Sequence, residues 1–231
     1  MKRFLTSIFL VTLLVFFGCG DLTKRVNSTI DPAPYTTVVE ISSSNCTIQG
    51  DTATILVSYI NRFDFYRTMS ALESKSIKKI HLVVSSGGGS LHDMSSILDM
   101  LNRFKLNGGS VTSHAMGVIG SAAIPIYLQG DYRTMGYHVE GMLHPHSLWG
   151  KKLSMYTYKE EDDLDSVPTA KTLFKDSVMR WTRRYAQMLV DKTNLTFDEA
   201  WKYLTTGDET TGMWYFSAKQ MLVMGFAHKL I

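Results

Sequence analysis

Residues 80–89, with the sequence IHLVVSSGGG, decide the fold of this chain. Four of the five residues at 80–84 have branched apolar side chains and predict a β-strand, and the glycines at 87–89 predict a turn directly after it. Residues 91–104 follow with apolar side chains three or four positions apart, which is the spacing of an amphipathic helix. This order of strand, turn and helix is typical of one unit of a parallel sheet.

The same alternation continues on both sides of this unit. Before it, residues 53–57 predict a strand and residues 61–74 a helix. After it, residues 111–115 predict a strand, residues 121–128 a short buried helix, and residues 141–144 the end of a further strand. The order predicts an α/β fold whose parallel strands are joined by right-handed crossovers.

The C-terminal part of the chain is predicted to be mainly helical. A long helix with an apolar face begins near Thr169. Thr196 has the character of an N-cap, and Glu199 stands where its capping-box partner would be. Ser217 is placed to cap a final helix.

The composition describes a globular protein. Hydrophobic residues make up 45% of the 231 positions and charged residues 19%, which is not the balance of a disordered chain. The formal net charge is only +3, and lysine and arginine are scattered along the sequence. Nucleic-acid binding is therefore not indicated.

The first twenty residues have the layout of an export signal. Lys2 and Arg3 precede an apolar run at 4–17, which is short for a membrane-spanning helix and ends in Gly-Cys-Gly. A cysteine at this place resembles a bacterial lipoprotein signal, in which the thiol is acylated. We therefore predict lipidation at Cys19 and an exported protein held at the membrane of the cell envelope. A plain signal peptide and an uncleaved anchor are the alternatives.

Three regions follow from this interpretation. Residues 1–19 are the predicted signal, residues 20–37 a tether with two closely spaced prolines, and residues 38–231 a single folded domain. With Cys19 lipidated, Cys46 has no partner, which excludes a disulfide framework. Cys46 is interpreted as a small apolar core residue.

Glycines 87–89 and Ser121 are the first candidates for chemistry. Glycines after a strand allow backbone N–H groups to approach a ligand, either as an anion cradle or as an oxyanion hole, and they also occur in plain turns. No Gly-Lys-Ser/Thr follows, so a P-loop is not supported. Ser121 lies among small residues at the start of a predicted helix, where it is either an N-cap or a nucleophile.

A serine nucleophile needs a base, and histidine titrates near neutral pH. His144 and His146 follow Ser121 in the sequence, at the end of a predicted strand. Taken alone, each could also be an ordinary loop histidine. Members of a catalytic triad typically come from such separate segments.

Together these segments resemble the proteolytic subunit of Clp protease, whose fold is shared with signal peptide peptidase A and the crotonases. The resembling segments are residues 85–91 (SSGGGSL, for the family's Asn-Ser-Pro-Gly-Gly turn), 117–123 (GVIGSAA, for Gly-x-Ala-Ala-Ser-Met-Gly), 142–144 (MLH, for Met-Ile-His), 216–218 (FSA, for Leu-Ser-Ala) and 224–227 (MGFA, for Tyr-Gly-Leu-Val). The resemblance implies a ClpP/crotonase-like superhelix of βαβ units with a long handle helix.

The resemblance also implies roles for individual residues. Ser121 corresponds to the nucleophile and His144 to the general base, while the N–H groups of Gly89 and Ala122 correspond to the oxyanion hole. His146 fits the family's spacing from serine to histidine, whereas His144 fits its motif. We favour His144.

The third acid of the triad is less well defined. The family's aspartate lies four residues before the serine of Leu-Ser-Ala, and that position here is Met213. Counting forward from the helix that begins at Thr196 leads instead to Asp208. Asp208 is therefore the candidate, with Glu209 next, and both could also be solvated loop acids.

These expectations describe an exported, lipid-anchored serine endopeptidase that cleaves short or unfolded polypeptides. The resemblance implies a homo-oligomer, and neither a cofactor nor a metal is needed. One alternative is a non-catalytic relative that serves as an assembly or binding module. The other is a Ser-Lys peptidase like signal peptide peptidase A, for which Lys151 and Lys152 are candidates by position.

Overall fold

The structure is a computed structural model that describes residues 39–40, 45–145, 147–148, 151–152, 168–208 and 210–231. All of them belong to the compact unit Thr36–Ile231, which is distinct from a second unit, Met1–Tyr35. The predicted signal and tether lie outside the described residues, as do Cys19, His146 and Glu209.

The described residues form a nine-stranded sheet with the order β1-β2-β3-β4-β5-β6-β11, in which β7 pairs with β5 and β10 with β7. The strands are β1 (Val39–Glu40), β2 (Cys46–Gln49), β3 (Thr52–Val57), β4 (Lys79–Ser86), β5 (Ser110–Gly120), β6 (Tyr132–Met135), β7 (Glu140–Leu143), β10 (Trp214–Ser217) and β11 (Lys229–Leu230). Strands β3 to β6 run parallel, so the predicted α/β fold with a parallel sheet is confirmed.

Three antiparallel pairings in this sheet were not expected from the sequence, and the first joins β1 to β2. Strand β2 pairs antiparallel with β3 through a tight hairpin, in which Gly50 takes a φ of +60° that suits such a turn. Strand β10 runs antiparallel to β7. In addition, β8 (Ser147–Leu148) and β9 (Lys151–Lys152) form a separate two-stranded sheet.

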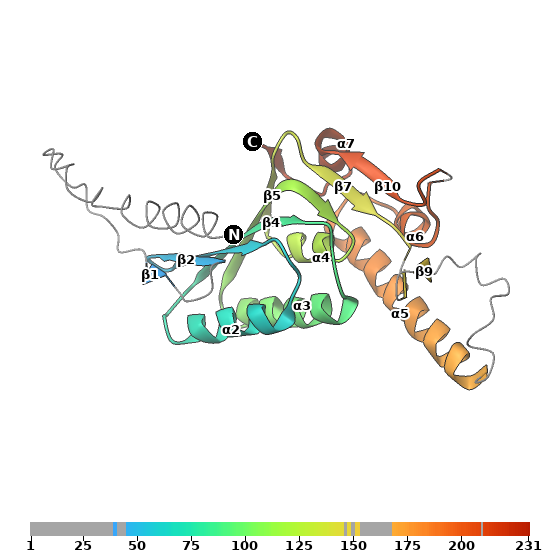
Figure 1. Cartoon of the computed structure of the whole chain (residues 1–231). Helices are drawn as coiled ribbons and strands as arrows, with labels where there is room; N and C mark the ends of the chain where they lie inside the picture. Colours follow the sequence, from blue (N-terminus) through green and yellow to red (C-terminus); the bar gives the residue numbers. More distant parts are fainter. Residues whose placement is uncertain (1–38, 41–44, 146, 149–150, 153–167, 209) are drawn as a thin grey trace, which may run out of the picture. The chain divides into compact units, whose positions relative to one another are not determined.

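The helices are α2 (Arg62–Glu73), α3 (Leu91–Leu106), α4 (Ala123–Tyr127), α5 (Pro168–Lys192), α6 (Phe197–Thr205) and α7 (Ala218–Val223). Helices α2 and α3 lie on the same side of the sheet (Figure 1). The capping box predicted at Thr196 and Glu199 is present, and Ser217 caps α7 as expected. The predicted long helix is α5, with 25 residues.

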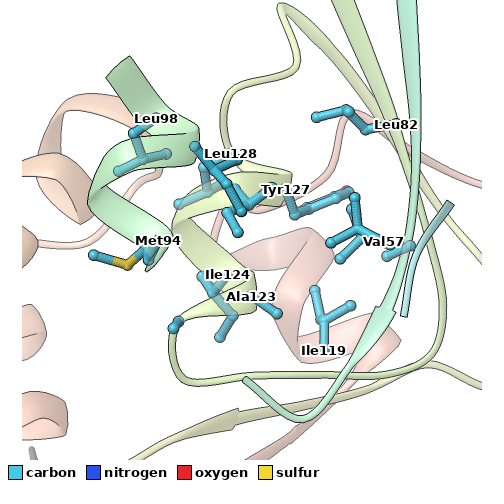
Figure 2. Packing of buried hydrophobic residues seen from close by; sticks show 14 of the residues in the cluster. Val57, Leu82, Met94, Leu98, Ile119, Ala123, Ile124, Tyr127 and Leu128 are labelled. Carbon is cyan, nitrogen blue, oxygen red and sulfur yellow. The ribbon is translucent and has the colours of Figure 1, made fainter. Parts of the chain in front are cut away.

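The core lies between the sheet and the helices. Along β4, the side chains of Ile80, Leu82 and Val84 are buried, while the alternate positions are partly exposed. Figure 2 shows apolar side chains of the strands meeting those of α3 and α4. Cys46 is a buried free cysteine, which confirms its interpretation as a core residue, and burial raises the pKa of its thiol.

In the part of the chain that the structure describes, no helix combines the length and the apolar composition needed to cross a membrane. Within the same residues, no group of three or more His, Cys, Asp or Glu side chains is arranged to hold a metal ion.

Candidate active site

Ser121 follows directly after β5 and has an unusual backbone. Its φ is +50°, in the left-handed region that side chains other than glycine rarely adopt. The N-cap of α4 is Ala122, which forms no side-chain cap, so the interpretation of Ser121 as a helix cap is wrong. A strained residue that is held in place by its surroundings is a common feature of functional sites.

Three hydrogen bonds to the backbone groups of Ser121 hold this conformation. The N–H of Ser121 donates to the carbonyl oxygen of Met142 in β7, at 2.8 Å. The carbonyl oxygen of Ser121 accepts the N–H of Ile124 at 3.1 Å and the hydroxyl of Tyr185 at 2.8 Å. Strand β7 and helices α4 and α5 thus all fix the same residue. The sequence predicted a long helix with an apolar face in this region, but it gave no sign of this contact.

The glycine turn after β4 packs against Ser121. Gly88 has a φ of +115°, and a Cβ at this position would lie 2.7 Å from the Cβ of Ser121 and 2.9 Å from the carbonyl oxygen of Gly120. Such distances leave no room for a side chain. Glycine is therefore required at Gly88 both by the backbone angle and by the neighbouring nucleophile candidate.

The two predicted oxyanion donors lie at this junction. The N–H of Gly88 donates to the hydroxyl of Ser86 at 3.3 Å, whereas the N–H groups of Gly89 and Ala122 take part in no hydrogen bond with another described residue. Ala122 is the residue after Ser121, and Gly89 is the residue after Gly88. The turn and the nucleophile segment thus bring the two predicted donors into one region.

A cavity of about 380 Å³ lies beside the glycine turn. It is lined by residues 59–63, which lead into α2, and by Ser90, His92 and Asp93 at the start of α3. Gly89 of the turn packs against Ile60 in the lining of this cavity. A Cβ at Gly89 would lie 3.1 Å from the Cβ of Ile60.

His144 comes directly after β7. Strand β7 pairs in parallel with the end of β5, with Gly120 opposite Met142, so Ser121 and His144 both follow the ends of adjacent strands. The Nδ1 atom of His144 lies 2.6 Å from the carbonyl oxygen of Pro145. Because a carbonyl only accepts, Nδ1 carries the proton and Nε2 is left as the acceptor, which is the form that a general base needs.

No hydrogen bond between Ser121 and His144 is found among the described residues. Catalytic hydrogen bonds often shorten only when substrate binds.

The carboxylate of Asp208 caps its own loop. Its Oδ1 accepts the N–H groups of Thr210 at 3.0 Å and Thr211 at 3.1 Å, and these bonds lower the pKa of Asp208. The candidate third acid is thus engaged locally, and its proposed role towards His144 stays a prediction.

The strand β10 pairs with β7 just before His144. Trp214 in β10 pairs with Leu143 in β7. Beyond this last pair, the chain continues from β7 to His144, and the residue directly before β10 is Met213. This is the position at which counting back from Ser217 placed the family's aspartate. The hydroxyl of Tyr215 donates to the sulfur of Met213 at 3.3 Å.

Comparisons with known proteins agree with this fold. The model of the Clp protease family matches residues 61–154, a segment that contains Gly89, Ser121, Ala122 and His144 but ends before Asp208. Among solved structures, a point mutant of ClpP1 from Listeria monocytogenes matches with a TM-score of 0.60 and 19% identity, over 77% of this chain and 90% of that chain. No curated protein sequence matches this chain. The resemblance to the Clp protease proteolytic subunit is therefore confirmed, and so is the ClpP-like fold.

Proposed function

We propose that this ClpP-like chain is a serine peptidase that cleaves short or unfolded polypeptides. The observation that carries the proposal is the close packing of Gly88 against Ser121, whose backbone is held in the left-handed region. A serine that only caps a helix or fills a core needs neither a glycine packed against it nor a left-handed backbone. Both features suit a nucleophile next to an oxyanion hole.

The proposed reaction uses the groups that converge on Ser121. The hydroxyl of Ser121 attacks the peptide carbonyl, and Nε2 of His144 takes the hydroxyl proton. The N–H groups of Gly89 and Ala122 stabilise the oxyanion that forms. His144 then passes the proton to the leaving amine as the C–N bond breaks. Water, activated in the same way, hydrolyses the resulting ester and restores Ser121.

The imidazole of His144 must be held in the correct tautomer. The sequence assigns this role to Asp208, with Glu209 as the next candidate. In the structure, the carbonyl oxygen of Pro145 lies 2.6 Å from Nδ1 and already selects the tautomer that leaves Nε2 free. A carbonyl gives less stabilisation to an imidazolium than a carboxylate does, so a dyad of this kind would be slower than a full triad.

The wider setting of the activity is proposed from the sequence. The pattern of residues 1–20 supports export and lipidation at Cys19, and an exported protein would have no ATP-driven unfolding partner. We therefore propose that its substrates are already short or unfolded. A homo-oligomer is supported by the likeness to ClpP.

A fluorophosphonate probe tests the proposal on the full chain. Wild-type protein should form a covalent adduct on Ser121, which Ser121→Ala abolishes. His144→Ala should reduce the labelling rate about a hundredfold or more, because the base is lost. The exposed His138 offers a matched control, and His138→Ala should label at the wild-type rate. Labelling that is indifferent to His144 would favour a lysine base instead.

A non-catalytic binding module is the second candidate. It is favoured by Met213, which directly precedes β10 where the family's aspartate would stand, and by the local engagement of Asp208. Folded wild-type protein that neither reacts with the probe nor cleaves a denatured protein would establish this alternative and contradict the peptidase.

A further inference from the structure

Tyr185 reaches the active-site segment from the long helix α5. Its side chain is only 3% exposed, and its hydroxyl donates to the carbonyl oxygen of Ser121 at 2.8 Å. Burial raises the pKa of Tyr185 well above its usual value, so this hydroxyl stays protonated and remains a donor at any pH at which the protein would work.

The carbonyl of Ser121 and the N–H of Ala122 belong to one peptide group. Because a peptide group is planar and trans, its C=O and N–H point in opposite directions, and holding one fixes the other. A donor on the carbonyl oxygen also polarises the group and strengthens its N–H as a donor. The contact of Tyr185 therefore acts on the N–H of Ala122, on the far side of the same peptide plane.

We propose that Tyr185 is a positioning residue that aims the N–H of Ala122 at the oxyanion and holds Ser121 in its left-handed conformation. The inference rests on the proposed peptidase function. Ile124 shares the task, since its N–H bonds the same oxygen at 3.1 Å. The bond from Ile124 joins residues only three positions apart. The bond from Tyr185 instead ties the peptide group between Ser121 and Ala122 to a separate helix, more than sixty residues later in the chain.

Tyr185→Phe removes only the hydroxyl and keeps the ring that fills the core. Tyr127→Phe is the matched control, because Tyr127 is also fully buried and donates its hydroxyl to a carbonyl oxygen, that of Thr134 at 3.0 Å. Both variants lose one buried hydrogen bond and should be destabilised to a similar degree. Only Tyr185→Phe should alter the oxyanion donor.

The kinetic test compares the two variants with wild type on a peptide ester or an unfolded polypeptide. We expect Tyr185→Phe to lower kcat about tenfold with KM nearly unchanged, because an oxyanion donor acts in the transition state. The rate of fluorophosphonate labelling should fall by a similar factor. Tyr127→Phe should keep both within about twofold of wild type. Equal losses in the two variants would overturn the proposal while leaving the peptidase function intact.

Hydrogen exchange at the Ile124 amide provides a readout that needs no catalysis. Its exchange should be about tenfold faster in Tyr185→Phe than in Tyr127→Phe, because the shared carbonyl is no longer held from α5. Unchanged exchange at Ile124 would contradict the proposal. If wild-type protein fails to label, the peptidase function itself fails, and the exchange experiment alone then decides whether Tyr185 orders this peptide.

Discussion

A Cβ on Gly88 would lie 2.7 Å from the Cβ of Ser121, which is closer than two such atoms can approach. This contact joins the end of one parallel strand to the end of the next. It makes the glycine turn and the nucleophile candidate a single structural unit, so a change in the turn must act on Ser121.

Gly88→Ala should therefore inactivate the protein. The new methyl group would displace Ser121, and the φ of +115° would be strained for alanine. We expect at least a hundredfold loss of kcat/KM and a decrease of about 2 kcal/mol in the free energy of unfolding. Activity assays and urea denaturation measure the two effects.

Gly87→Ala is the control for that change. A Cβ at Gly87 would meet no atom within 4 Å, so this variant should fold and react much like wild type. An inactive Gly87→Ala would show that the turn itself, rather than its contact with Ser121, is what the reaction needs.

Asp208→Asn shows whether the Asp208 carboxylate only caps its own loop or also acts as the third acid towards His144. The side chain accepts backbone N–H groups from its own loop, and Nδ1 of His144 is bonded to Pro145 instead. We expect kcat/KM to fall less than tenfold, with a small loss of stability. A loss of a thousandfold or more, with the fold intact, would assign Asp208 the part of the third acid.

The stability of the fold should decrease in acid. The pKa of Glu199 is lowered by its hydrogen bonds with Thr196, and that of Asp208 by the N–H groups of Thr211 and Thr210. A carboxylate with a lowered pKa in the folded state stabilises the fold above its unfolded pKa of about 4, and this contribution is lost as pH falls through the folded value.

Thermal unfolding between pH 7 and pH 2 checks this expectation. Glu199→Gln should lower the melting temperature at neutral pH and make it less dependent on pH below about 5. A wild-type melting temperature that stays constant across this range would contradict the assignment of these two carboxylates.

Arg133 is expected to be among the most important residues for stability. Its guanidinium is buried and donates to four backbone carbonyl groups rather than to an acid. The acceptors are the carbonyl oxygens of Phe226 (2.8 Å), Gly130 (3.1 Å), Lys192 (2.8 Å) and Gly225 (3.2 Å). Arg133→Ala would leave these groups unpaired, and we expect it to lower the free energy of unfolding by about 3 kcal/mol or more.

Urea denaturation measures this loss, with Arg183→Ala as the control. Arg183 is exposed on α5, so its replacement should change stability by less than about 0.5 kcal/mol. Similar stabilities for the two variants would show that the carbonyl groups around Arg133 find other partners.

Most of the parallel sheet could be predicted because its signals are local. In β4 the buried positions alternate, and the glycines that end the strand are adjacent in the sequence. Likewise, the capping box of Thr196 and Glu199 spans only four residues. Each of these features follows from the chemistry of neighbouring side chains, without knowledge of the rest of the fold.

The antiparallel pairing of β10 with β7 was missed because it depends on distant segments. Strand β10 is only four residues long and pairs with β7, more than seventy residues earlier in the chain. For the same reason, the third acid could be placed only by counting residues. Counting back from Ser217 led to Met213, which directly precedes the strand β10 that pairs with β7.

The active-site segment was predicted in part. The sequence identified Ser121 and the glycine turn, yet it also allowed Ser121 to be a helix cap. The structure excludes the helix cap, because the N-cap of α4 is Ala122, and the nucleophile remains a proposal. The role of Tyr185 could not be foreseen, because helical spacing predicts that a tyrosine is buried but not which carbonyl its hydroxyl meets.

The left-handed backbone of Ser121 supports the proposed role of its side chain. Among the described residues, positive φ angles occur at six glycines and at two serines, Ser76 and Ser121. Ser76 is exposed, whereas Ser121 lies where the sheet, α4 and α5 meet. Glycine would adopt this conformation with less strain, so stability alone would favour glycine over serine at this position. The serine strains the fold, and the proposed nucleophilic role gives a reason for a serine at this position.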